Sequence, residues 1–220
     1  MKSSRFPDVP IGPDESIDDF MDGRLRLIQS RSGYRFSIDA LLLSEFVTTK
    51  PEDLVVDLGT GCGIILLTLL LTRAVRYGVG LEIQEDLADQ ALRNALLNGF
   101  GRKMGVILGD IRHPPLAPST ADVVVCNPPY RKTCSGRVNP DRQRAIARHE
   151  IMASLDDILD TAHRLLKPKG RLAVVYSAER LVDLLVRLRG FDLEPKRVRV
   201  IYPHLESEAK LVLVEAARGG

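Results

Sequence analysis

Residues 54–63, LVVDLGTGCG, place three glycines at alternate positions directly after a short apolar run. The run predicts a buried strand over 54–58, and the apolar residues that follow the glycines predict a helix over 63–72. Glycine permits a tight turn between the two elements, and it leaves room for a ligand against the main chain where a Cβ would intrude. This stretch therefore predicts an α/β domain with a ligand site at the glycine loop.

The rest of the chain continues the alternation of strands and helices. Further strands are expected over 79–83, 105–110, 121–127, 171–176, 193–202 and 210–216, and further helices over 86–98, 151–167 and 178–189. The tetrapeptide KPKG at 167–170 is expected to end the second of these helices. Strands that alternate with helices predict a mostly parallel sheet with helices on both faces.

The first fifty residues differ from this pattern and are expected to form an extension packed on a domain of residues 51–220. Residues 1–20 are acidic, and we expect them to be a loose lead-in. Residues 24–28 alternate polar and apolar side chains, which predicts a short strand. Ser37 is a suitable N-cap for a helix that runs to about Val47.

Composition and charge narrow the class of protein. The net charge of the 220 residues is only +2, so the total does not by itself indicate a nucleic-acid-binding protein. The three cysteines form no C-x-x-C pair and the four histidines lack metal-ligand spacing, which favours reduced thiols in the cytoplasm and no metal. The longest apolar run, residues 64–71, is far shorter than the roughly 20 residues of a membrane span, so we expect no membrane association.

Polar side chains stand at the ends of four predicted strands: Asp57, Glu82, Asp110 and Asn127. Because ligands of open α/β sheets bind outside the carboxyl ends of the strands, we expect all four at one edge. Glu82 is suited to hold ribose hydroxyls, and Asp110 to accept a hydrogen bond from an adenine amine. Any one of these acids, taken alone, could equally be a solvated loop carboxylate.

The spacing of the glycines is G-x-G-x-G, which differs from the dinucleotide-binding pattern G-x-G-x-x-G. The loop also begins with an acid, Asp57, and contains no Lys or Arg, so it suits a cationic ligand better than a pyrophosphate. S-adenosylmethionine carries a sulfonium, an ammonium and an adenosine but no phosphate. At this point there are two alternatives. The glycines could only form a tight turn without a ligand, or the protein could be an enzyme that binds a nicotinamide cofactor.

The segment CNPPY, residues 126–130, ends the predicted strand over 121–127. An exocyclic amine on an aromatic base is a poor nucleophile, because its lone pair is delocalised. The side-chain oxygen of Asn127 and the carbonyl of Pro128 can accept its two N–H bonds and direct the lone pair at an incoming methyl group. Tyr130 supplies a face on which a flipped base can stack. A glutamine amide would fit the motif equally well.

The segments DLGTGCG, LEI, GDI and CNPPY together resemble the Rossmann-like, class I S-adenosylmethionine-dependent methyltransferases that methylate amino groups. The resemblance implies an α/β fold with a seven-stranded, mostly parallel sheet whose last strand is antiparallel. It also implies S-adenosylmethionine as cofactor and S-adenosylhomocysteine as product. By position, the cofactor-binding residues would be Asp57, Gly59, Gly61, Glu82, Ile83, Asp110, Ile111 and Asn127, and the catalytic residues Asn127, Pro128 and Tyr130.

A narrower resemblance rests on GYRFSIDALLLSEF at 33–46, CNPPYR at 126–131 and ARHE at 147–150. These segments are similar to those of the bacterial tRNA adenine-N6 methyltransferases, which modify the adenine beside the anticodon of a valine tRNA. The family places the segment of Arg35 and Phe36 over the cofactor. Glutamine methyltransferases that act on release factors share the NPPY motif, but they carry a longer helical N-terminal domain. An enzyme for another RNA or DNA adenine, or a non-catalytic RNA-binding subunit, are further alternatives.

Two segments carry enough positive charge to contact the phosphates of a tRNA. Residues 24–35 hold four arginines and no acid, and residues 131–150 hold six Lys or Arg against two acids. An ordinary solvated face is the alternative for each segment. The expected substrate-binding residues are Pro129, Tyr130, Arg131, Lys132, Arg142 and Arg144. His149 and Glu150 receive no role, and either a monomer or a homodimer fits the sequence.

Overall fold

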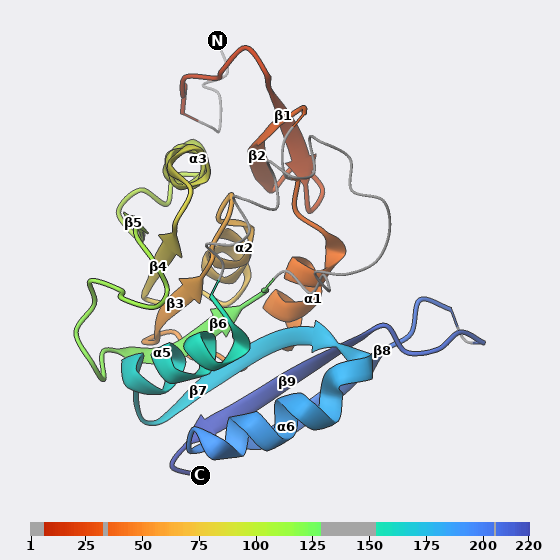
Figure 1. Cartoon of the computed structure of the whole chain (residues 1–220). Helices are drawn as coiled ribbons and strands as arrows, with labels where there is room; N and C mark the ends of the chain where they lie inside the picture. The colour runs from red at the N-terminus through yellow and green to blue at the C-terminus, as the bar shows by residue number, and fades with distance from the viewer. Residues whose placement is uncertain (1–6, 33–34, 129–152, 205) are drawn as a thin grey trace, which may run out of the picture.

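The computed structural model describes residues 7–32, 35–128, 153–204 and 206–220, and it contains a seven-stranded sheet beside a separate two-stranded hairpin (Figure 1). The sheet consists of β3 (Leu54–Leu58), β4 (Tyr77–Glu82), β5 (Met104–Leu108), β6 (Ala121–Cys126), β7 (Leu166–Ser177), β8 (Leu193–Ile201) and β9 (Leu211–Arg218). The hairpin consists of β1 (Glu15–Phe20) and β2 (Leu25–Ser30). The helices are α1 (Ile38–Phe46), α2 (Ile64–Thr72), α3 (Glu85–Leu97), α5 (Leu155–Leu165) and α6 (Leu181–Gly190), with a short 3-10 helix over Ala178–Arg180.

The strand order of the large sheet is β5-β4-β3-β6-β7-β9-β8. The five strands from β5 to β7 pair in parallel, and β9 lies antiparallel between β7 and β8. The last strand of the chain is therefore the one that runs against the others, which confirms the predicted fold class. The chain changes direction across the sheet between β3 and β6, and such a switch point is where ligands of α/β sheets bind.

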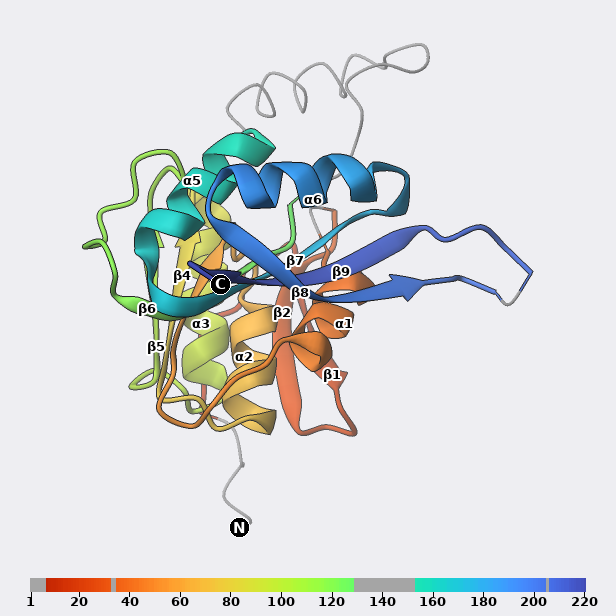
Figure 2. The ribbon, with the colours of Figure 1, turned by 90° about the horizontal axis from the view of Figure 1, so that it is seen from below.

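Helices cover both faces of the sheet, as the view from below shows (Figure 2). Neighbouring residues of a strand point to opposite faces, so a strand buried on both sides is a continuous apolar run. Val55 and Val56 are both fully buried, and each lies in a different apolar core. The core that contains Val55 is formed with α1, α2 and α3, and the other with α5 and α6.

The prediction that residues 1–20 form a loose lead-in is wrong for Glu15–Phe20, which form β1. This strand carries only two apolar side chains, Ile17 and Phe20, so its alternation is too weak to recognise locally. Its conformation comes from antiparallel pairing with β2, with Glu15 opposite Ser30 and Phe20 opposite Leu25. The division into an extension of residues 1–50 and a domain of residues 51–220 stays a prediction.

The segment KPKG, residues 167–170, lies within strand β7 and not between a helix and a strand. Helix α5 ends at Leu165, and β7 begins at once with Leu166, which pairs with Ala121 of β6. The register then shifts, so that Val123 pairs with Arg171 and residues 167–170 form an irregular stretch within the strand. The expected helix over 151–167 is thus shorter at its end, and residues 151–152 lie outside the described part of the chain.

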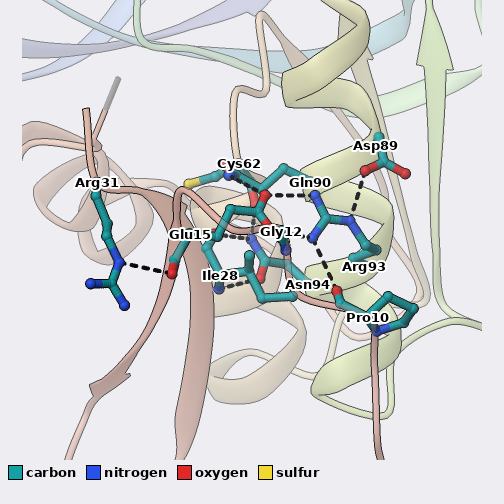
Figure 3. A network of polar contacts seen from close by, with 10 residues as sticks. All are labelled: Pro10, Gly12, Glu15, Ile28, Arg31, Cys62, Asp89, Gln90, Arg93 and Asn94. Carbon is teal, nitrogen blue, oxygen red and sulfur yellow. Dashed lines mark hydrogen bonds and ion pairs between the residues drawn. The ribbon is translucent and has the colours of Figure 1, made fainter. Parts of the chain in front are cut away.

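An ion pair fastens the hairpin to α3 (Figure 3). The Arg93 guanidinium donates to both carboxylate oxygens of Glu15, at 2.7 Å each, and neither side chain is more than 17% exposed. The Gly12 amide donates to the same carboxylate at 2.6 Å, and the Gln90 amide group donates at 3.4 Å. The hydrogen bonds from Arg93 are the main reason that the pKa of Glu15 falls from 4.5 to about 2.

We expect Glu15→Gln to lower the free energy of unfolding by about 2 kcal/mol at pH 7, because a charged donor loses its partner in a partly buried site. Ionised Glu15 stabilises the folded protein above pH 4.5, and this contribution is lost as the pH falls toward about 2. Urea titrations should therefore show the difference between the two proteins shrinking through that window. Asp89→Asn, which removes an exposed partner of Arg93, is the control and should cost less than about 0.5 kcal/mol. Equal losses for both variants would contradict this account.

Candidate active site

The glycine loop joins β3 to α2 in a conformation that only glycine adopts readily. The φ angles of Gly59, Gly61 and Gly63 are +76°, +55° and +85°. The amides of Gly59 and Thr60 donate to the carbonyl of Leu81 in β4, at 2.8 and 3.1 Å. The loop is therefore a tight turn, as the sequence pattern predicts, and the structure adds that it is fastened to the neighbouring strand.

Glu82 ends β4 beside this loop and is almost completely buried. One carboxylate oxygen accepts a hydrogen bond from the Gly61 amide and the other from the Gln84 amide, both at 2.9 Å. A carboxylate oxygen has a second lone pair, so both oxygens can still accept from a ribose hydroxyl. The sequence suggested a ligand-binding role for Glu82, and the structure adds that Glu82 also holds the loop.

Asp57, the last but one residue of β3, is completely buried. The Thr60 hydroxyl donates to its Oδ2 at 2.8 Å, while its Oδ1 is buried with no hydrogen-bond partner among the described residues. Burial is the main cause that raises the pKa of Asp57 to about 7, and the charge of Glu82 adds to it. A buried, unsatisfied carboxylate oxygen fits a site for a cationic ligand.

The space for Thr60 depends on a further glycine that sequence reasoning did not single out. A Cβ at Gly80 in β4 would lie 2.6 Å from the Thr60 methyl carbon, so any larger residue would displace Thr60 and with it the hydrogen bond to Asp57. Thr60 itself could have been found from the sequence, because a hydroxyl three residues after an acid can reach back to it in a tight loop.

Asp110 follows β5, and its carboxylate is held by a near neighbour, Arg112. The Arg112 Nε lies 3.0 and 2.9 Å from the two oxygens, and the Arg112 amide donates to Oδ1 at 2.9 Å. These bonds keep the pKa of Asp110 below its usual range. Asp110 is therefore ionised and fixed at this edge, and an adenine amine would have to share it with Arg112. Sequence reasoning did not foresee this pair.

Two apolar side chains border the loop. A Cβ at Gly59 would meet only the Ile111 Cδ1, at 3.9 Å, so the backbone of Gly59 has open space beside it and Ile111 nearby. Ile83, directly after Glu82, is 43% exposed. The loop thus has open backbone, apolar flanks and nearby carboxylates, and it contains no cation that could bind a phosphate. These features fit S-adenosylmethionine.

Asn127 and Pro128 directly follow β6, the strand that pairs with β3 on the side away from β4. Cys126 lies opposite Leu58, and its thiol donates to the Leu58 carbonyl at 3.2 Å. Asn127 is partly buried and Pro128 is buried. The remaining predicted residues lie outside the described part of the chain: Pro129, Tyr130, Arg131, Lys132, Arg142 and Arg144. His149 and Glu150, which received no role, also lie outside it.

Arg35 and Phe36 contact the hairpin. The Arg35 guanidinium forms an ion pair with Asp18 of β1 at 2.5 Å. The centroids of the Phe36 and Phe20 rings lie 4.9 Å apart. Their predicted place over the cofactor stays a prediction. In the described ranges, no cluster of three or more His, Cys, Asp or Glu side chains is placed to hold a metal ion. None of the helices described has the length and apolarity that a membrane crossing requires.

The sheet and its glycine-loop edge define a class of protein, the Rossmann-like methyltransferases that use S-adenosylmethionine. A family model described as a methyltransferase domain matches residues 49–208. In fold, the chain is similar to a crystal structure of a predicted O-methyltransferase from Agrobacterium tumefaciens, with a TM-score of 0.67 and 20% identity over 83% of this chain and 81% of that one.

Comparison with curated proteins gives the particular family. A tRNA1(Val) (adenine(37)-N6)-methyltransferase from Porphyromonas gingivalis is 31% identical over 206 residues, which are 90% of this chain and 80% of that protein. A protein of the same name from Parabacteroides distasonis is 30% identical over 178 residues, 80% of this chain and 74% of that protein. This chain belongs to the tRNA1(Val) (adenine(37)-N6)-methyltransferase family.

We expect the affinity for S-adenosylmethionine to rise between pH 6 and pH 8, because Asp57 loses its proton near pH 7 and the carboxylate favours a cationic ligand. Asp57→Asn should weaken binding at pH 8 and flatten this rise, as measured by isothermal titration calorimetry. Asp110→Asn is the control, because Asp110 is ionised across the whole pH range. Its loss should change the affinity by the same factor at every pH and leave the rise with pH in place. The amine of the ligand titrates alike in all three proteins. Equal pH slopes in wild type and Asp57→Asn would refute the role given to Asp57.

Proposed function

We propose that the protein transfers the methyl group of S-adenosylmethionine to the exocyclic N6 amine of adenine 37 in tRNA1(Val). The observation that carries this is the parallel pairing of β3 with β6, which brings the glycine loop after Leu58 and the Asn-Pro pair after Cys126 to one edge. The relatives quoted above are named for adenine methylation in tRNA, which favours adenine over the glutamine amide that the motif alone would also fit. A tRNA substrate supports a cytoplasmic location for the enzyme.

Four of the proposed cofactor-binding residues have a role that follows from their position or chemistry. Asp57 offers an unsatisfied buried carboxylate oxygen, and Glu82 offers fixed lone pairs for the ribose. Ile83 and Ile111 supply apolar surface for the adenine ring. When bound, S-adenosylmethionine supplies an activated methyl group and leaves as S-adenosylhomocysteine.

The proposed catalytic step needs acceptors rather than a strong base, because the nitrogen becomes cationic and acidic as it gains the methyl group and then releases one proton to water. The Asn127 side-chain oxygen and the Pro128 carbonyl accept the two N–H bonds of the target amine, which draws the nitrogen toward tetrahedral geometry and frees its lone pair. Burial of Pro128 against the fold holds its carbonyl in place before the base arrives. Pro129 and Tyr130 would contact the flipped base, and Arg131, Lys132, Arg142 and Arg144 the tRNA phosphates.

We expect Asn127→Ala to reduce turnover by at least about 10²- to 10³-fold, the typical cost of removing one preorganised group from a transition-state site. Affinity for S-adenosylhomocysteine should change much less. The assay is transfer of labelled methyl to tRNA that lacks the modification, with release factor as the alternative acceptor. Unchanged turnover would refute the role of Asn127, and label in release factor alone would refute the tRNA substrate.

We expect the double substitution Arg142→Glu and Arg144→Glu to weaken tRNA binding and to make it less sensitive to salt. Each lost phosphate contact should reduce the slope of log affinity against log salt by roughly 0.7 to 0.9. Filter binding across a salt series measures this slope, and calorimetry with S-adenosylhomocysteine is the control, which should not change. A wild-type slope in the variant would exclude these two arginines from the phosphate contacts.

A further inference from the structure

Asn94, on helix α3, is completely buried, and its amide group joins the main chains of two residues that are far apart in sequence, Ile28 and Cys62 (Figure 3). Its Oδ1 accepts a hydrogen bond from the Ile28 amide at 2.6 Å. Its Nδ2 donates to the carbonyls of Ile28 and Cys62, at 3.1 and 3.0 Å. One side chain thus contacts the hairpin strand β2 and the glycine loop at the same time.

Cys62 lies between Gly61 and Gly63, in the part of the loop with positive φ angles. Glu82 holds the loop from one side through the Gly61 amide, and Asn94 holds it through the Cys62 carbonyl. Glycines lose more conformational freedom on ordering than other residues. A loop that is ordered before its ligand arrives binds more tightly, because the ordering does not have to occur on binding.

Asn98, one helical turn further on, makes a parallel set of contacts without reaching the loop. Its Oδ1 accepts from the Arg26 amide at 2.9 Å, and its Nδ2 donates to the Arg26 carbonyl at 2.6 Å and to the Asn94 carbonyl at 2.8 Å. The two asparagines therefore dock β2 in the same way, and the contact with Cys62 is what distinguishes Asn94.

We infer that Asn94 is a positioning residue for the cofactor loop and that it couples the N-terminal hairpin to the binding of S-adenosylmethionine. The inference rests on the proposed function, because it assumes that the glycine loop holds this cofactor. Asn94 acts through the loop backbone and not on the reacting atoms. Its loss should therefore raise the dissociation constant and the KM for the cofactor, and leave kcat at saturating cofactor nearly unchanged.

The test compares Asn94→Asp with Asn98→Asp. In ionised form, each aspartate keeps an oxygen that accepts from β2 and loses two donated hydrogen bonds, but only Asn94→Asp loses the bond to the loop. Asn94→Ala and Asn98→Ala form a second pair that adds no charge to a buried site. Thermal unfolding establishes that each variant is folded, and calorimetry without tRNA gives the dissociation constant for S-adenosylhomocysteine.

We expect both Asn94 variants to bind S-adenosylhomocysteine about tenfold more weakly, equivalent to about 1.4 kcal/mol, and both Asn98 variants to stay within about twofold of wild type. Binding within twofold of wild type by a folded Asn94 variant would overturn the inference. Equal weakening by the Asn98 variants would overturn it too, because hairpin docking alone would then explain the loss. Failure of the wild type to bind S-adenosylhomocysteine would instead overturn the proposed function.

Discussion

The central strand β3 pairs in parallel with β4 along one edge and with β6 along the other, so three strand ends meet in one stretch of the sheet edge. Leu58 lies opposite Leu81 on one side and opposite Cys126 on the other. The glycine loop, Glu82 and Asn127 follow these positions directly in the chain. The site thus depends on strand register first, and the individual side chains act from positions that the register has set.

The two carboxylates beside the glycine loop, Asp57 and Glu82, need hydrogen-bond donors because they are buried. Asp57 and Glu82 are both buried next to a loop that contains three glycines, and the Thr60 hydroxyl and two main-chain amides supply their hydrogen bonds. Buried carboxylates are costly unless they are paired or hydrogen-bonded. In the proposed function, the partly unsatisfied Asp57 is stability given up for cofactor binding, which is common at functional sites.

Local patterns predicted the sheet and the edge on which the site lies. The strand over 54–58, the glycine loop and the run that ends at Cys126 were readable because continuous apolar stretches and glycine spacing are local signals. Features that depend on distant partners were missed. The strand Glu15–Phe20 requires β2, the irregular stretch at 167–170 follows from pairing with β6, and the contacts of Asn94 are set by tertiary structure. The Asp110–Arg112 pair is local and was missed for another reason, because it depends on the conformation of the turn after β5.

Asn94 of α3 and Asn98, which caps the end of that helix, have a consequence for the solubility of the hairpin. An isolated β-strand edge presents unpaired N–H and C=O groups, and other chains can pair with it and aggregate. On the edge of β2 away from β1, the main-chain groups of Arg26 and Ile28 are taken by the amides of Asn98 and Asn94, which imitate a neighbouring strand. The helix thereby closes an edge that two strands alone would leave available for self-association.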